Sequence, residues 1–407
     1  MRPLVPSFTS PLVLPTVALG LLAGACTLSD RMSRSESTSV RAPTRDSAGV
    51  QIVEYGGSLM DLPSAFRIVE SPLLDLGGPR GDPDHELTPS HPFHHAARLS
   101  DGRWVVPDRS SLKVFDAEGR FLSAIGRRGD GPGEFRQPRR VCIAPGDSIV
   151  AIDQNGSRVT VFSSDGALVR MFTVRDGYPE ASGCLGDGSV LTSVDVRPDP
   201  ADSVYRVATL RSASLTGSDR GAVATIPLGA PSIVVQMQGH AVPDGDLVYT
   251  GDGRLPEVRV YHRDGRLERI VRWADTPVAV TDEVFAQVVR AVLPTGNFEE
   301  NLARQRARRH PSTFPVYQQI LLDDAGRMWV QDAPDVLNPQ SWKPSLPWTV
   351  FDASGRPLGR LRAPALSDGF VDISGVAEDG VWLRWKDDEL GFVHLTFHPL
   401  ERISESP

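Results

Sequence analysis

Two short stretches, Asp101-Gly102-Arg103-Trp104-Val105-Val106 and Val114-Phe115-Asp116-Ala117-Glu118-Gly119, decide the fold of this chain. The first is a tight turn that leads into an apolar strand, and the second is a strand that ends in a glycine turn. The turn of the first stretch returns five more times, at Gly146-Asp147, Asp187-Gly188, Asp244-Gly245, Ala325-Gly326 and Asp379-Gly380. One such hairpin unit cannot bury its faces alone, so six copies predict an all-β fold, a six-bladed β-propeller.

The composition fits one large repeat domain. The chain has 407 residues, including 37 glycines and 34 prolines, which suits many tight turns and few long helices. Because the repeat is spread evenly from residue 94 to residue 397, we expect one domain over residues 49–407. The formal net charge is −8, with both signs interspersed and no basic stripe, which argues against a nucleic-acid partner.

We expect four antiparallel strands in each blade, written a to d outward from the axis of the ring. The innermost strands are predicted at residues 94–99, 140–143, 183–185, 234–241, 316–322 and 371–377. Blade 6 lacks an obvious fourth strand at the C-terminal end of the chain. One or more of the apolar segments Val50–Glu54, Phe66–Val69 and Leu73–Leu76 is predicted to complete it, which closes the ring and hides an edge.

Residues 281–309 interrupt the β pattern between blades 4 and 5. Thr281 is a predicted N-cap. The apolar residues that follow it at helical spacing are Val284, Phe285, Val288, Val289 and Val292. Pro294 ends this helix, and a second helix is expected over Phe298–Arg309. We expect the insert to pack as a flap over one face of the ring; the alternative is a structural brace.

Residues 1–25 are predicted to be a signal peptide. The apolar stretch Pro11–Ala25 is too short to span a bilayer. Leu22-Ala23-Gly24-Ala25-Cys26 resembles the lipobox of bacterial lipoproteins, which implies cleavage before Cys26 and lipidation of its side chain. The alternative is a plain secretory signal. Residues 26–48 are polar and predict a disordered tether, so we expect a cell-envelope protein anchored to a bacterial membrane, with the outer membrane favoured.

Cys142 and Cys184 are the other two cysteines, and both lie on predicted innermost strands of consecutive blades. An exported protein permits a disulfide between them. The alternative is two buried thiols that act as small core residues.

The b–c and d–a connectors of a propeller lie on one face, called the connector face below. Asp108, Asp153 and Asp332 end predicted b strands, and Arg127 and Arg128 lie in the connector between blades 1 and 2. Propeller ligands commonly sit on such loops, so these residues are candidate ligand contacts. The alternative for each aspartate is a cap on its own b–c turn. Two tryptophans of the long b–c loop of blade 5, Trp342 and Trp348, are candidates for stacking on a sugar or peptide, with loop packing as the alternative.

Histidines offer a catalytic alternative. His94 and His95 lie on strand a of blade 1, and His240 lies on strand a of blade 4, across the ring. Since strands alternate, one of the first two could hold a divalent metal in the channel together with His240. The sequence contains no nucleophile elbow, phosphate loop, EF-hand or paired-cysteine zinc motif. Apart from such a metal, no cofactor is expected.

The run Val114-Phe115-Asp116 … Gly126-Arg127-Arg128-Gly129-Asp130-Gly131-Pro132-Gly133-Glu134-Phe135 resembles the blade connector of bacterial six-bladed propeller lipoproteins, relatives of the NHL-repeat proteins. Its glycines permit a tight crossover, and Phe135 is expected to wedge between blades. The resemblance implies an exported, often lipid-anchored interaction module. We therefore expect non-catalytic binding of an envelope protein, peptide or glycan at the connector face. The alternative is a metal-dependent lyase or hydrolase that uses the central channel.

Overall fold

The computed structural model describes residues 42–78, 84–88, 95–153, 158–174, 178–230, 232, 234–235, 237–338 and 345–403. The predicted signal peptide, Cys26, His94 and Trp342 lie outside these residues. Within them, the helices are too short or too polar to cross a bilayer.

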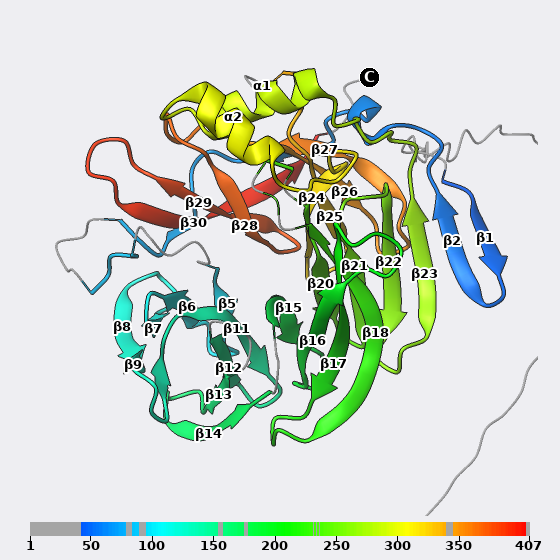
Figure 1. The fold of residues 1–407 in the computed structure, drawn as a ribbon. Helices are drawn as coiled ribbons and strands as arrows, with labels where there is room; N and C mark the ends of the chain where they lie inside the picture. The colour runs from blue at the N-terminus through cyan, green and yellow to red at the C-terminus, as the bar shows by residue number, and fades with distance from the viewer. Residues whose placement is uncertain are drawn as a thin grey trace, which may run out of the picture. The chain divides into compact units, whose positions relative to one another are not determined.

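Six antiparallel sheets follow one another along the chain, as the turn period predicts (Figure 1). Their strands are, in blade 1, β5 (Ala97–Arg98), β6 (Trp104–Asp108), β7 (Ser111–Phe115) and β8 (Phe121–Ile125); in blade 2, β11 (Pro138–Ala144), β12 (Ser148–Asp153), β13 (Arg158–Phe162) and β14 (Leu168–Thr173); in blade 3, β15 (Tyr178–Cys184), β16 (Val190–Pro198), β17 (Arg206–Ala213), β18 (Asp219–Ala230) and β19 (Met237–Gln238); in blade 4, β20 (His240–Asp244), β21 (Leu247–Gly251), β22 (Glu257–His262) and β23 (Leu267–Arg272); in blade 5, β24 (Tyr317–Leu322), β25 (Met328–Asp332), β26 (Pro347–Phe351) and β27 (Pro357–Arg362); in blade 6, β28 (Asp372–Val376), β29 (Gly380–Lys386) and β30 (Val393–Arg402).

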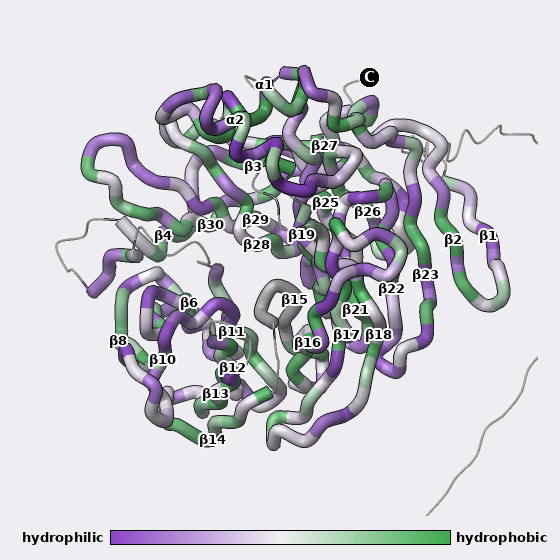
Figure 2. The backbone as a smooth tube through the Cα atoms, in the orientation of Figure 1, coloured by the Kyte–Doolittle hydropathy of each residue, from purple (hydrophilic) through white to green (hydrophobic). Residues whose placement is uncertain are grey.

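The hydrophobic core lies between neighbouring blades, where the apolar faces of consecutive sheets meet. Figure 2 shows hydrophobic stretches along the strands and hydrophilic ones at the turns and on α2. Trp104 of blade 1 packs edge-on against Trp382 of blade 6, with ring centroids 4.9 Å apart. Each blade therefore depends on its two neighbours for burial of its apolar side chains.

The ring closes as predicted, through strands that precede blade 1. β3 (Phe66–Ile68) and β4 (Leu74–Asp75) both pair antiparallel with β30, the third strand of blade 6. The third candidate segment does not join blade 6. It forms β2 (Val50–Glu54), which pairs in parallel with β23 at the outer edge of blade 4. β1 (Thr44–Ser47) pairs with β2 in turn, so the expected disordered tether is wrong for its last residues.

The insert between blades 4 and 5 forms α1 (Asp282–Val292) and α2 (Phe298–Arg306). The Thr281 side chain accepts from the N–H of Val284, which confirms the predicted cap. Phe285, Val288 and Val289 are buried against residues of the connectors of blades 3 to 5. The helices thus cover these connectors, and the described lining of the central cavity comes from strands and connectors alone.

The connector between blades 1 and 2 inserts a side chain between these two blades. Phe135 is fully buried between the two blades and lies 5.9 Å from the ring of Phe162. Gly126 has a φ of +77°, and a Cβ there would come within 2.5 Å of the Phe135 ring. β9 (Arg127–Arg128) and β10 (Glu134–Phe135) pair in parallel and hold the loop closed. The expected wedge at Phe135 is confirmed.

Removal of the closing strands is expected to abolish cooperative unfolding. Phe66, Ile68 and Leu76 are each at most 6% exposed, so a chain beginning at residue 78 loses part of two inter-blade clusters and an edge pairing. A chain beginning at residue 56 lacks only β1 and β2 and serves as the matched control. Urea unfolding, followed by circular dichroism and tryptophan fluorescence against a chain beginning at residue 42, measures the difference. A single transition at the reference midpoint for the shortest chain would contradict this closure.

Candidate functional site

A cavity of about 790 Å³ lies along the axis of the ring. The innermost strands β11, β15, β20, β24 and β28 line it, and His95 contributes from just before β5. This volume falls within the range of roughly 300–1,000 Å³ that is common for small-molecule sites.

The two ends of the cavity differ in polarity. The chain enters each innermost strand from the connector face, so the first residues of each strand lie near that end. Polar side chains occupy these positions and positions near the ends of two b strands: Arg139, Arg140, His240, Gln318, Gln331, Asp372 and Arg384. Deeper positions are apolar or sulfur-bearing: Cys142, Cys184, Val242, Pro243, Ile320 and Leu321. The connector end is therefore the polar mouth of the cavity.

Arg140 and His240 lie near each other at this mouth. Arg140 is exposed to the cavity, and partial desolvation by the surrounding blades lowers the pKa of its guanidinium from the ordinary value. Burial, aided by the positive charge of Arg140, lowers the pKa of His240 to about 4, although a bond to the main-chain oxygen of Gln318 opposes the change. His240 is therefore neutral at physiological pH, with its Nε2 2.7 Å from that oxygen.

Asp372 and Arg384 face each other across β28 and β29, where they are paired residues of the ladder. Burial raises the pKa of Asp372 to about 6, and the nearby positive charge of Arg384 opposes this. Asp372 is thus the one described carboxylate among the residues that line the cavity, and its charge changes close to neutral pH.

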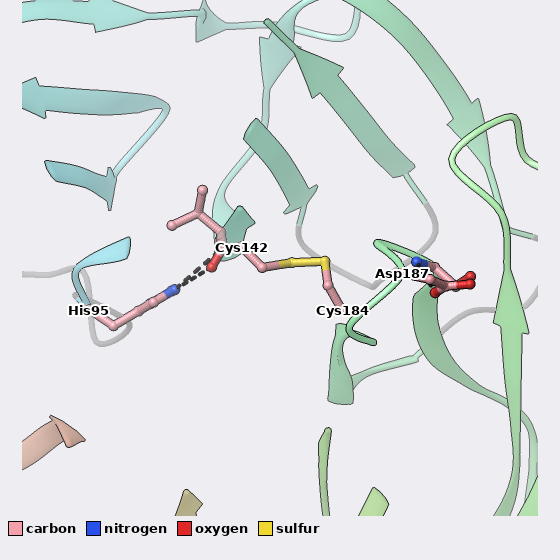
Figure 3. The surroundings of a disulfide bond; sticks show 6 residues. His95, Cys142, Cys184 and Asp187 are labelled. Atoms are coloured by element: carbon pink, nitrogen blue, oxygen red, sulfur yellow. Dashed lines mark hydrogen bonds between the residues drawn. A yellow bond between two sulfur atoms is a disulfide. The ribbon is translucent and has the colours of Figure 1, made fainter. Parts of the chain in front are cut away.

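A disulfide forms part of the inner wall. Cys142 of β11 and Cys184 of β15 are bonded, with Cα atoms 6.2 Å apart, so the disulfide joins neighbouring blades (Figure 3). His95 lies beside it, and its Nε2 is 3.1 Å from both the N and the O of Val141. Of the two alternatives for these cysteines, the structure shows the bonded pair.

The aspartates expected to contact ligand are buried structural groups. Asp108 and Asp153 end their b strands as predicted but are only 4% and 2% exposed. Asp108 accepts from the N–H and hydroxyl of Thr88. Asp153 accepts from the N–H groups of Arg136 and Gln137, at 3.0 and 2.7 Å, and pairs with Arg158. Each holds the connector that leads into its own blade, which differs both from ligand contact and from a cap on the b–c turn.

The remaining connector-face candidates also lie away from the cavity. Asp332 pairs with Arg360, and burial raises its pKa to about 6. Arg127 pairs with Glu134 at 2.9 Å, and Arg128 is exposed on β9. Trp348 lies on strand β26 rather than in the predicted b–c loop, and it is 1% exposed in the core between blades 5 and 6, so it is a core residue and not a stacking surface.

Two of the histidines that could hold a metal, His95 and His240, line the cavity. The Nε2 of each lies within hydrogen-bonding distance of a main-chain oxygen. His94 lies outside the described residues. Among the residues that the structure does describe, groups of three His, Cys, Asp or Glu side chains that could hold a metal are absent.

Sequence reasoning missed Arg140, Asp372 and Arg384. A usable signal existed for Arg140, because it begins a predicted innermost strand, where a charged residue is uncommon. Asp372 carries the same signal in blade 6.

Replacement of Asp372 by Asn is expected to stabilise the fold at pH 7.5 and to have little effect near pH 4. The folded pKa of about 6 lies above the ordinary value of 3.8, so this group's contribution to stability is present at low pH and is lost as pH rises through 6. Because water in the cavity screens this charge, we expect the free energy of unfolding at pH 7.5 to rise by only about 1–2 kcal/mol.

Urea unfolding at both pH values measures this gain, with Asp368→Asn as the exposed control. Asp332 titrates in the same pH range, but it is present in every variant, so its effect cancels when the variants are compared with the parent chain. Equal gains at pH 7.5 and pH 4 would show that Asp372 is not the titrating group.

Sequence comparison supports the repeat in one region. Residues 95–175 match the sequence model of the DUF5128 family, described as a 6-bladed beta-propeller. The chain is also 36% identical over 81 residues, 20% of its length, to RING finger protein nhl-1 of Caenorhabditis elegans. It spans only 8% of the length of that protein.

One solved structure supports the fold. A presumed exported protein of Bacteroides fragilis superposes with a TM-score of 0.53 and 13% identity, over 87% of this chain and all of the other. A DUF4221 member from Bacteroides vulgatus has a TM-score of 0.49 and 12% identity, over 84% and 99% of the two chains. Because the first of these proteins is only 13% identical to this chain, its similarity shows the fold alone. The six sheets and the closed ring make this chain a six-bladed β-propeller, and the match over blades 1 and 2 is to a family described by the same fold.

Proposed function

We propose that this protein is a non-catalytic binding module whose ligand enters the central cavity from the connector face. The observation that carries the proposal is the polar mouth, where polar side chains from blades 2, 4, 5 and 6, among them three arginines, converge on one end of a cavity of about 790 Å³. A fold built only for stability gains nothing from charged groups placed around an internal space, because their desolvation is unfavourable.

The insert and the disulfide support a fixed binding site. α1 and α2 bury apolar side chains against connectors of the same face, which limits the movement of those loops. The Cys142–Cys184 bond joins two strands of the cavity wall. Both cavity histidines already bond main-chain groups, which favours binding over metal-dependent lysis or hydrolysis.

The proposal places the module in the bacterial cell envelope, anchored through Cys26, with an envelope protein, peptide or glycan as its ligand. The lipobox-like run before Cys26 supports this, as does the disulfide, which is stable in an oxidising compartment.

Lipidation predicts that the full chain, expressed in a bacterium, partitions into the detergent phase of a Triton X-114 extraction, while Cys26→Ser stays in the aqueous phase. Mass spectrometry of the mature N-terminus should find an acylated Cys26, and Ser29→Ala is the control. A mature N-terminus elsewhere, or a Cys26→Ser variant that still enters detergent, would contradict the anchor.

Blocking the mouth is expected to abolish binding. In a chain beginning at residue 42, Cys142 and Cys184 are bonded, so a single introduced cysteine is the only free thiol. Phe370→Cys, at the mouth, and Asp379→Cys, in the a–b turn of blade 6 on the opposite face, are labelled with a bulky maleimide. Thermal shifts are then measured with a panel of peptides, glycans and sugars.

Ligand-induced shifts should disappear with the label on residue 370 and persist with the label on residue 379. Shifts that survive the first label, or a panel without any shift, would count against the proposal. Stoichiometric metal that is lost in His240→Ala would instead indicate the metal-dependent alternative.

A further inference from the structure

Arg140 is an arginine without a counter-ion inside the ring. By contrast, Arg158 pairs with Asp153, and Arg327 pairs with Asp323 at 2.7 Å. Arg140 is exposed on β11, where it lines the cavity, and the described residues offer it neither an ion pair nor a hydrogen bond. Because Arg140 is exposed to the cavity, its guanidinium donors remain available to an oxyanion that enters there.

Arg384 adds to the positive charge of Arg139 and Arg140 at the same mouth. Its Nε is buried and has no hydrogen-bond partner among the described residues. Asp372 is the one described carboxylate in the cavity lining, and one ionised carboxylate cannot neutralise three arginines. The mouth therefore carries a net positive charge although the whole chain carries −8.

The neutral groups at the mouth suit a polyhydroxylated ligand. Gln238 and Gln318 present amides that can donate and accept hydrogen bonds, and Gln331, which is 6% exposed, also lines the cavity. Phe370 also lines the cavity and is 45% exposed, which leaves part of its ring available for contact with the apolar face of a sugar.

We propose that the polar mouth binds an acidic sugar, with its carboxylate or phosphate on Arg140 and Arg384, its hydroxyls on the glutamines and its ring against Phe370. Guanidinium groups suit these oxyanions because they offer two parallel N–H donors. The inference rests on the proposed function and deepens it, since it names the ligand class of the same site.

Three sugars that share the glucose ring but differ in charge test this proposal: glucose, glucuronate and glucose 6-phosphate. Calorimetric titration of the chain beginning at residue 42 should detect binding of one or both acidic sugars, with glucose at least about tenfold weaker. Binding of glucuronate alone identifies a carboxylate ligand, and binding of glucose 6-phosphate alone identifies a phosphorylated one; either result supports the proposal.

Arg140→Gln should weaken binding of the acidic sugar about tenfold, and Arg384→Gln should weaken it less because Asp372 offsets that charge. Arg120→Gln, an exposed arginine of the β7–β8 turn, removes the same charge elsewhere and should leave affinity unchanged. Arg140→Lys keeps the charge but loses the two-donor geometry, and is expected to restore part of the affinity.

Stability distinguishes a ligand-binding arginine from a structural one. Because Arg140 has no partner in the fold, Arg140→Gln should unfold at the same urea concentration as the parent chain or a higher one. A lower midpoint would assign Arg140 a structural role and overturn the proposal. Equal binding of all three sugars, binding of none, or an Arg140→Gln variant that binds like Arg120→Gln would also overturn it. If a neutral ligand from the panel is blocked by the label on residue 370 while both acidic sugars fail, the ligand class is wrong and the binding mouth stands.

Discussion

Burial between blades is the constraint on which this fold depends. A four-stranded blade has two broad faces, and here each is covered by a neighbouring blade rather than by a separate layer. Such an arrangement is stable only when the first and last blades also meet. The chain achieves this by giving the outer strands of blade 6 to its N-terminal part, so that β30 pairs with β3 and β4 across more than three hundred residues of sequence. The central cavity is a consequence of the same closure, because six twisted sheets cannot meet at the axis.

The parts of the fold that were predicted correctly have local signals. Turn glycines such as Gly102 and Gly119 have positive φ values, and alternation follows on either side, so the blades could be counted from the sequence. Thr281 and the apolar stripe after it similarly located α1. The strand β2 illustrates what remained hidden: its partner is β23, more than two hundred residues away, and parallel pairing leaves no turn signal between them.

The cavity lining was harder to predict, for a specific geometric reason. Strict alternation would send one of two adjacent residues inward, yet Arg139 and Arg140 both line the cavity, as do Gln318 and Gln319. Register shifts interrupt β11 between Pro138 and Arg140, and β24 between Tyr317 and Gln319. A bulge changes which residues face the axis, and its position is not evident from the residue pattern. His240 was identified because a histidine on an innermost strand is conspicuous by itself. Asp108 and Asp153 were misassigned because their partners lie in connectors that the sequence pattern does not place.

The route of the chain before blade 1 has a mechanical consequence for a protein held at its N-terminus. From β1 the chain passes along blade 4, where Tyr55 donates to the main-chain oxygen of Arg272 and Ala274 donates to that of Gly57. It then crosses blade 5, where Arg360 bonds the oxygen of Met60 at 2.8 Å, before it reaches β30. Tension on the N-terminus is therefore resisted first by the β1–β2 hairpin and the parallel pair with β23. The strands that close the ring carry no force until those attachments have broken, so the tether is separated from the closure that keeps the propeller folded.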